Sequence, residues 1–201
     1  MTPSVNSIPE RVWSALGRGC ARLLLLAWLL PAVSAADSNY TEAEVKAAAL
    51  SRIVDYVKWP AGTFADAKSP IVIGVIGRNL FEGELSQVLK SANTNGIGRP
   101  VIVRQYKDGE TVANCQILFV AASEKSRVAQ ILQKIEHTGI LTISDMEGFV
   151  TRLGGGLRLF IDKSLQVEVN QNTVEREKII IDPEFLGMRK TRIIRDGKVV
   201  K

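Results

Sequence analysis

The chain has 201 residues, of which 46% are hydrophobic and 23% are charged, so it is long enough for one domain with a sizeable core and too apolar for a disordered protein. The first 36 residues contain three arginines and one glutamate, so residues 37–201 carry a net charge of about +3. Such a mild charge, with basic residues scattered among acidic ones, argues against a nucleic-acid partner.

Residues 1–36 have the pattern of a secretory signal peptide. Three arginines precede the short apolar run "LLLLAWLLPAV", and small residues follow up to a cleavage site at Ala35 or Ala36. An uncleaved membrane anchor is disfavoured because the run is short for a bilayer and contains Pro31. We therefore expect residues 37–201 to be exported as one mature domain.

The mature chain opens with a predicted helix. Thr41 and Glu44 have the spacing of a capping box, and apolar residues then recur at helical spacing as far as Val57. Pro60 is expected to end this helix, because its ring disfavours helical geometry at the residue before it. Trp59 is expected to cover the core beneath the helix end, and a contact with a ligand or partner is the alternative.

The remaining elements alternate between strands and helices. Continuous apolar runs predict buried strands at 70–77 and 115–122, and alternation predicts a strand at 99–106. The sequence further predicts helices at 79–90 and 123–137 (the latter with Ser123 as its N-cap), a strand at 139–145, a loop at 146–156, a hairpin of 157–162 and 165–170 across Asp162-Lys163-Ser164, and a helix running into a strand at 171–181.

This order predicts an α/β fold. It favours a single-domain three-layer sandwich with a mixed, mostly parallel sheet, helices on both faces and a C-terminal β-hairpin at one edge. The domain core is expected at about residues 42–186. The last 18 residues are expected to fray as a tail, although the segment "TRII" is able to pair or pack.

Catalytic signatures are weak in this sequence. Arg78 follows a strand that ends in glycine, but neither dinucleotide-binding nor P-loop spacing is present, so a tight strand-to-helix turn is favoured. His137 is the single histidine and stands at a predicted helix end. Asp145 and Glu147 form a carboxylate pair for which a turn role is favoured over acid–base catalysis. No metal site, cofactor site or catalytic set is therefore predicted.

Two other features leave alternatives open. Cys115 is the one cysteine of the mature chain, which rules out an internal disulfide; a buried structural thiol is favoured over an intermolecular disulfide or a redox role. Three consecutive glycines, Gly154 to Gly156, either let the backbone approach a ligand or partner or form a flexible turn into the next strand.

Several blocks of the sequence together resemble the YfiR/HmsC-like family of periplasmic proteins. They cover roughly residues 42–186 and occur in the family's order: "KAAALSRIVDYVKWP", "IVIGVIGRN", "IGRPVIVRQY", "NCQILFVA", "ILTISDMEGFVTRLGGGLRLFI" and "LQVEVN". Two departures stand out. Gln116 takes the place of a histidine that relatives often have, and the C-terminal "IDPEFLGMRKTRII" replaces an expected leucine-rich helix.

The resemblance implies a periplasmic, non-enzymatic repressor. Such a protein binds the periplasmic sensor domain of an inner-membrane diguanylate cyclase, keeps it inactive, and so limits cyclic-di-GMP, exopolysaccharide and biofilm. The resemblance also suggests an outer-membrane lipoprotein that sequesters the regulator, and a homodimer, as further partners. The candidate partner- or ligand-binding residues are expected at exposed aromatic, apolar and basic positions: Trp59, Pro60, Phe64, Arg78, Phe149, Arg152, Leu153 and Arg158.

Two other classes of function compete with the repressor. The first is a periplasmic small-molecule-binding domain that serves sensing or transport; a cleft receptor usually has two lobes, whereas the mature chain is long enough for one domain. The second is a secreted hydrolase, for which His137 is the one obvious base.

Overall fold

Helix α2 (Glu42–Ile53) is the first element of the part of the chain that this computed structural model describes, which comprises residues 40–78, 81, 83, 85–88 and 99–201. The predicted capping box is confirmed. The Thr41 N–H donates to the Glu44 carboxylate at 2.7 Å, and the Glu44 N–H donates to the Thr41 hydroxyl oxygen at 3.1 Å. The predicted signal peptide lies outside the described residues, as does much of the predicted helix at 79–90, of which residues 85–88 are helical.

The first helix ends earlier than predicted. A single 3₁₀ turn, η2 (Val54–Tyr56), follows α2, and the chain is then extended in the short strand β1 (Val57–Lys58). This strand pairs antiparallel with β8 (Ile180–Ile181). Pro60 is therefore not the stop signal, because pairing with a distant segment already draws the chain out of the helix three residues before it.

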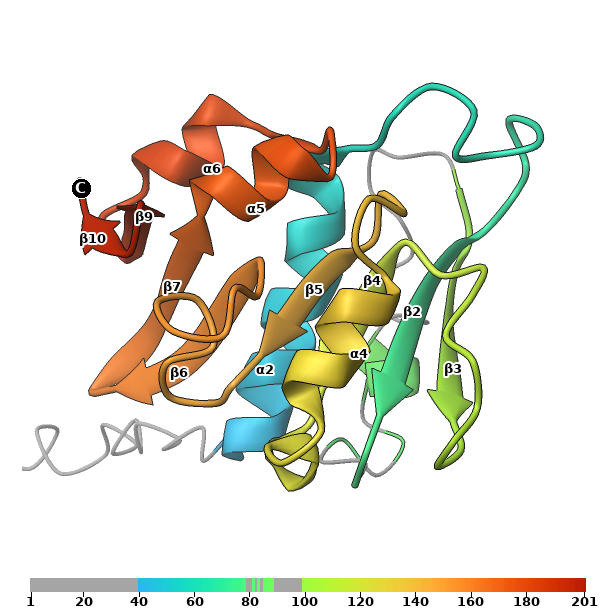
Figure 1. Ribbon diagram of the computed structural model, residues 1–201, viewed down its shortest axis with the longest axis horizontal. Helices are drawn as coiled ribbons and strands as arrows, with labels where there is room; N and C mark the ends of the chain where they lie inside the picture. Colours follow the sequence, from blue (N-terminus) through green and yellow to red (C-terminus); the bar gives the residue numbers. More distant parts are fainter. Residues whose placement is uncertain (1–39, 79–80, 82, 84, 89–98) are drawn as a thin grey trace, which may run out of the picture. The chain divides into compact units, whose positions relative to one another are not determined.

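Within the described residues, eight strands form one mixed sheet in the order β10-β9-β7-β6-β5-β4-β2-β3 (Figure 1). Neighbouring strands run parallel, except for the pairs β6–β7 and β9–β10. The strands are β2 (Ile71–Ile76), β3 (Val101–Tyr106), β4 (Ile117–Val120), β5 (Leu141–Ser144), β6 (Leu157–Asp162), β7 (Ser164–Asn170), β9 (Thr191–Arg195) and β10 (Lys198–Val199).

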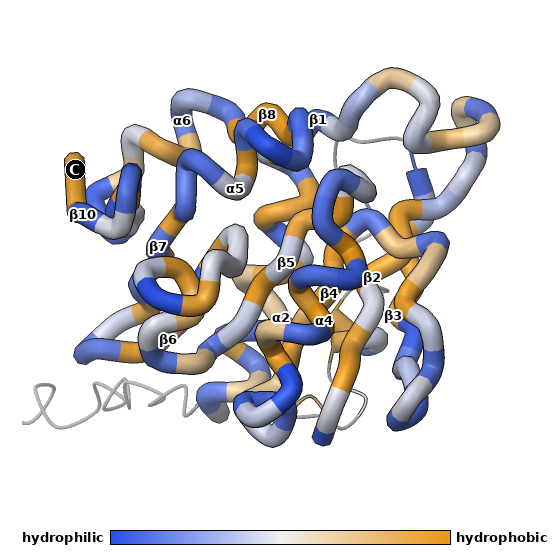
Figure 2. The backbone as a smooth tube through the Cα atoms, viewed as in Figure 1, coloured by the Kyte–Doolittle hydropathy of each residue, from blue (hydrophilic) through white to orange (hydrophobic). Residues whose placement is uncertain are grey.

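Apolar layers lie on both faces of this sheet, as predicted. Successive residues of β4 point to opposite faces: Ile117 and Phe119 join the core beneath α2, whereas Leu118 and Val120 join the core beneath α4 (Val128–Lys134). Hydrophobic residues concentrate in the central strands (Figure 2). The predicted three-layer α/β sandwich is therefore confirmed.

The hairpin of β6 and β7 is also confirmed, with Lys163 at the turn in the left-handed region (φ +56°). Its predicted place at the sheet edge is wrong. Strand β9 pairs parallel with β7, and β10 then forms the edge. The expected fraying tail is thus part of the sheet, and "TRII" pairs within it. The segment between β7 and β9 carries α5 (Gln171–Arg176) and α6 (Pro183–Gly187).

The predicted N-cap at Ser123 is wrong. Ser123 lies in a 3₁₀ turn, η3 (Ala122–Glu124), and α4 begins only at Val128, where the N-cap residue Arg127 makes no side-chain capping bond. The Ser123 hydroxyl instead accepts the Arg78 N–H at 2.9 Å. The serine therefore ties the end of β2 to the turn after β4.

Candidate functional site

The segment after β1 forms an aromatic corner, which we call the Trp-Pro corner and define as Trp59, Pro60, Phe64 and Arg99. Trp59 is half-buried against the core, as predicted, and its indole N–H donates to the Gln116 carbonyl at 3.2 Å. The Phe64 ring meets Trp59 edge-on, with 5.9 Å between ring centroids, and the Arg99 guanidinium lies 4.1 Å from the Phe64 centroid. The corner therefore brings together three of the predicted candidate residues, Trp59, Pro60 and Phe64.

This corner lies at the amino ends of the parallel strands, because Gln116 directly precedes β4. Binding sites of open α/β sheets usually lie at the opposite, carboxyl ends. A contact made by the corner is thus separate from the place where the fold usually holds a small ligand.

The loop between β5 and β6 holds three more predicted residues. Phe149 is wholly buried, so the expectation of an exposed contact there is wrong. Its ring lies so close to Gly155 that a Cβ at this glycine would stand 2.1 Å from a ring carbon. Leu153 is half-buried against the same core, whereas Arg152 is exposed, 3.6 Å from the carboxylate of Glu147. Gly155 therefore serves the packing of Phe149 rather than the approach of a ligand.

Arg158 lies on β6, away from the other predicted residues. Its side chain is mostly covered, with the guanidinium 4.1 Å from the centroid of the Phe160 ring and 3.4 Å from the Glu168 carboxylate of the neighbouring strand. These contacts are within one patch of the sheet. They hold Arg158 along the sheet, where its side chain is 17% exposed and offers little surface to a partner.

The carboxyl end of β2 carries a glycine turn that packs closely against the turn after β4. Gly77 has φ +90°, and a Cβ there would stand 2.6 Å from the Ser123 hydroxyl and 2.7 Å from Glu124. The predicted tight turn is confirmed, and Arg78 beside it is exposed.

The carboxylates of Asp145 and Glu147 do not form a catalytic pair. Asp145 is mostly buried and accepts a hydrogen bond from Lys46 Nζ at 2.8 Å, whereas Glu147 is exposed and faces Arg152. Among the described residues, no group of three or more His, Cys, Asp or Glu side chains is placed to hold a metal ion.

Cys115 is a free thiol buried just before β4, as the sequence favours. Burial raises the pKa of this thiol above its usual value, although a hydrogen bond with Tyr106 opposes the shift. A protonated, inaccessible thiol reacts slowly, and so the structure favours a packing role over a redox role.

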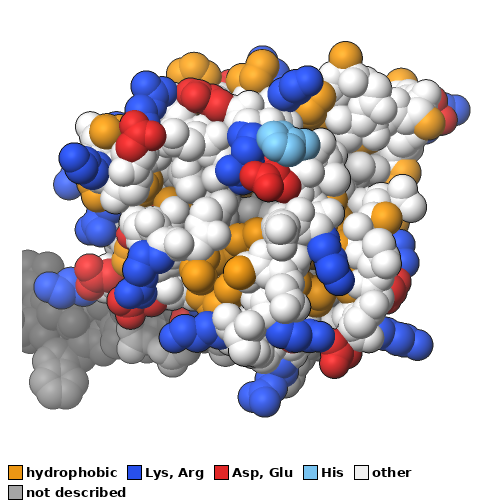
Figure 3. Space-filling model, viewed as in Figure 1, with side chains coloured by type: hydrophobic (Ala, Val, Ile, Leu, Met, Phe, Trp, Pro, Cys, Tyr) orange, Lys and Arg blue, Asp and Glu red, His pale blue; other side chains and the backbone are white. Residues whose placement is uncertain are grey.

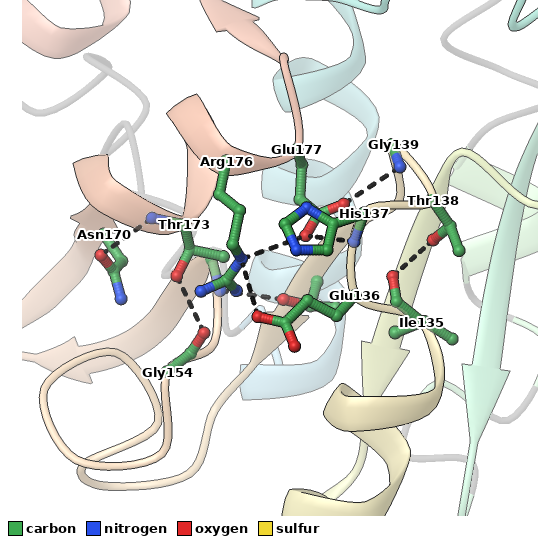
Figure 4. A network of polar contacts seen from close by, with 12 residues as sticks. Ile135, Glu136, His137, Thr138, Gly139, Gly154, Asn170, Thr173, Arg176 and Glu177 are labelled. Carbon is green, nitrogen blue, oxygen red and sulfur yellow. Dashed lines mark hydrogen bonds and ion pairs between the residues drawn. The ribbon is translucent and has the colours of Figure 1, made fainter.

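His137 belongs to a polar network that joins α4 to α5 (Figure 4). It has φ +62° at the turn after α4, and its N–H and that of Gly139 each donate to the buried Glu177 carboxylate at 3.1 Å. Arg176 pairs with both Glu177 and Glu136. Figure 3 shows the histidine on the surface between acidic and basic side chains. This network closes the turn after α4, and the part of the chain that the structure describes offers no serine or cysteine hydrogen-bonded to the imidazole.

Sequence reasoning missed an apolar groove of about 620 Å³ between α2 and the C-terminal elements. One wall is a second apolar stripe of α2, and the other comes from β7, α6 and the start of β9. Its lining residues are Tyr40, Glu44, Val45, Ala48, Ala49, Arg52, Ile53, Tyr56, Ser164, Leu165, Val167, Phe185, Met188, Lys190 and Thr191. The spacing of Val45, Ala48 and Arg52 on α2 is the signal in the sequence that was available for this surface.

These observations define an α/β domain with an aromatic corner and an apolar groove, and without a recognisable catalytic set among its described residues. No described helix has the length and apolar character needed to cross a membrane. The YfiR/HmsC-like family model matches residues 43–189, so the chain belongs to this family, whose members are regulators rather than enzymes. No individual curated protein matches the chain.

Proposed function

We propose that this protein is a periplasmic repressor of an inner-membrane diguanylate cyclase. The observation that carries the proposal is the family match, which spans residues 43–189 and so includes six of the eight strands of the described sheet. The signal-peptide pattern at 1–36 supports export to the periplasm. In this role the protein binds the periplasmic sensor domain of the cyclase and lowers cyclic-di-GMP, exopolysaccharide and biofilm.

The mechanism is a shift of population in the cyclase. The repressor binds the inactive state of the sensor domain more tightly than the active state, and a signal that weakens this preference releases the enzyme. An outer-membrane lipoprotein that captures the repressor would release the enzyme by a second route, because sequestration lowers the free concentration of repressor that reaches the cyclase. A homodimer of the repressor would present two surfaces for binding the sensor domain.

For the contact with the cyclase we favour the Trp-Pro corner over the other candidates. Phe64 and Arg99 form a stacked pair of the residue types that anchor interfaces, and Ile180, which pairs with Lys58 just before Trp59, is 61% exposed. Arg78, Arg152 and Leu153 remain further candidates at the surface. Phe149 is excluded by its burial.

The proposal is tested by measuring cellular cyclic-di-GMP in a strain that lacks the gene. Deletion should raise the level, the full chain should restore it, and residues 37–201 without the first 36 should not, because they stay in the cytoplasm. A level that stays flat on deletion under several stresses would refute repression. Restoration by the chain without the first 36 residues would refute the export.

The contact surface is tested in the same strain with two matched variants. Ile180 and Val199 both lie in two-residue strands and are 61% and 62% exposed. A glutamate at either position should leave the fold intact because the side chain stays in water. Ile180→Glu should then lose repression while Val199→Glu keeps it; equal repression by both would show that the interface does not reach Ile180, the exposed neighbour of the Trp-Pro corner, and would argue against the corner as the contact.

A further inference from the structure

The groove between α2 and the C-terminal elements has the size and lining of a small-ligand site. Its volume of about 620 Å³ falls inside the range of roughly 300–1,000 Å³ that holds drug-sized ligands. Its base is apolar, because Ile53, Val167 and Phe185 line it and belong to the buried core. Tyr40 and Met188 line it too but are exposed, at 69% and 37%.

The groove follows α2, which supplies lining residues from Glu44 to Ile53 and so forms one wall. The twelve residues of α2 cover about 18 Å at the usual helical rise. The rings of Tyr56 and Phe185, 5.4 Å apart, close the far end. A protein partner usually covers on the order of 800 Å² on each side of an interface. A groove beside a single helix is better suited to a flexible unbranched chain.

The charge at the rim selects the head of the ligand. Arg52 and Lys190 both line the groove. The ion pair of the Arg52 guanidinium is a long one, 3.8 Å to the Asp55 carboxylate, and among the described residues the Lys190 ammonium has no carboxylate within ion-pair distance. The one acidic group of the lining, Glu44, is already engaged by the hydroxyl and N–H of Thr41. The rim is therefore complementary to an anion.

We propose that this groove binds an aliphatic carboxylate, with its unbranched chain along α2 and its carboxylate between Arg52 and Lys190. The apolar base supplies affinity through the burial of methylene groups. The two cations supply charge-assisted hydrogen bonds to the head. This site is independent of the proposed contact with a cyclase, because it lies on different residues from the Trp-Pro corner.

The test measures the binding of decanoate, decanol and butyrate to residues 37–201 by isothermal titration calorimetry. Decanol has the same chain without the charge, and butyrate has the charge with a short chain. Arg52→Gln combined with Lys190→Gln removes the two cations, and Ala48→Phe fills the groove from an exposed position of α2. Lys125→Gln and Ala129→Phe are the matched controls, since both residues are exposed and lie outside the lining.

We expect decanoate to bind with one site per chain and more tightly than decanol or butyrate. The double charge variant should weaken decanoate binding about tenfold and leave decanol unchanged. Ala48→Phe should abolish the binding of both, and the two controls should bind like the wild type. Circular dichroism on each variant verifies that a loss of binding is not a loss of fold.

Three results would overturn the proposal. If decanoate does not bind, or binds Ala48→Phe as well as wild type, the groove is not the site. If the charge variant keeps full affinity for decanoate, the head group is not recognised there. If decanoate fails to bind and Ala48→Phe instead dissociates a dimer in solution, the groove is covered by a second copy of the chain.

Discussion

Lys46 and Asp145 form a nearly buried ion pair that joins α2 to the carboxyl end of β5. The Nζ–Oδ2 distance is 2.8 Å, and the two side chains are only 7% and 13% exposed. Burial lowers the pKa of Lys46, but hydrogen bonds and attraction to Asp145 and Glu42 outweigh it, so the pKa is raised above its usual value. The pair therefore fixes the start of the helix against the sheet.

Removing the lysine should destabilise the fold strongly. Lys46→Met leaves the carboxylate of Asp145 buried without its cation, and we expect a loss of about 3 kcal/mol in the free energy of unfolding, measured by urea denaturation at neutral pH. The double variant Lys46→Met with Asp145→Asn should recover part of this loss, because no charge is then buried without a partner. Glu42→Gln is the control: this second partner is 63% exposed, so the change should stay under about 1 kcal/mol. An equal effect of both single variants would contradict the account.

Tyr106 should make the fold sensitive to alkaline pH. Burial, followed by the nearby Cys115, raises the pKa of Tyr106 from 10.0 to about 12. Because the folded-state pKa is the higher one, this contribution to stability is complete below pH 10 and is lost as the pH rises towards about 12. The free energy of unfolding of the wild type should therefore fall more steeply above about pH 10 than that of Tyr106→Phe. Parallel curves for the two proteins would show that the phenol does not titrate in this way.

The indole N–H of Trp59 should contribute measurably to stability. Trp59→Phe keeps an aromatic ring against the core but removes the hydrogen bond to the Gln116 carbonyl, which then accepts only the Leu141 N–H at 2.9 Å. We expect a loss of about 1 kcal/mol in the free energy of unfolding, followed by far-UV circular dichroism. Tyr40→Phe, at an exposed position, should change it little. A Trp59→Phe protein as stable as the wild type would mean that this bond carries no net energy.

The contact between Gly155 and Phe149 should not tolerate any added atom. Gly155→Ala places a methyl group about where the ring of Phe149 lies, so it should destabilise the fold by more than about 2 kcal/mol. Combining it with Phe149→Leu should relieve part of the clash, and the two effects should therefore fall short of their sum. Gly187→Ala is the control because nothing lies within 4 Å of its added Cβ. Simple additivity in the double variant would argue against the contact.

Local patterns account for what the sequence predicts well. The capping box rests on two residues three apart, and the β6–β7 hairpin rests on two alternating runs around a short turn; both signals lie within a short stretch of the chain. The buried central strands are likewise readable, because a strand covered on both faces is apolar throughout.

The features that the sequence does not reveal depend on contacts between distant segments. The end of α2 is set by β8, more than a hundred residues away, and strand β9 gains its place only from the neighbouring β7. Phe149 reads as a surface aromatic in a polar, glycine-rich loop, yet the loop folds over it. The groove is also invisible locally, since its walls come from four separate elements.

The most direct test of the central claim is an epistasis measurement of cellular cyclic-di-GMP. The gene for this chain is deleted together with the gene for each inner-membrane diguanylate cyclase that has a periplasmic domain, one at a time. Repression predicts that the single deletion raises the level and that loss of one particular cyclase returns it to that of the cyclase mutant alone. If the rise persists in every double mutant, or never occurs, the protein does not act as the repressor of a membrane cyclase.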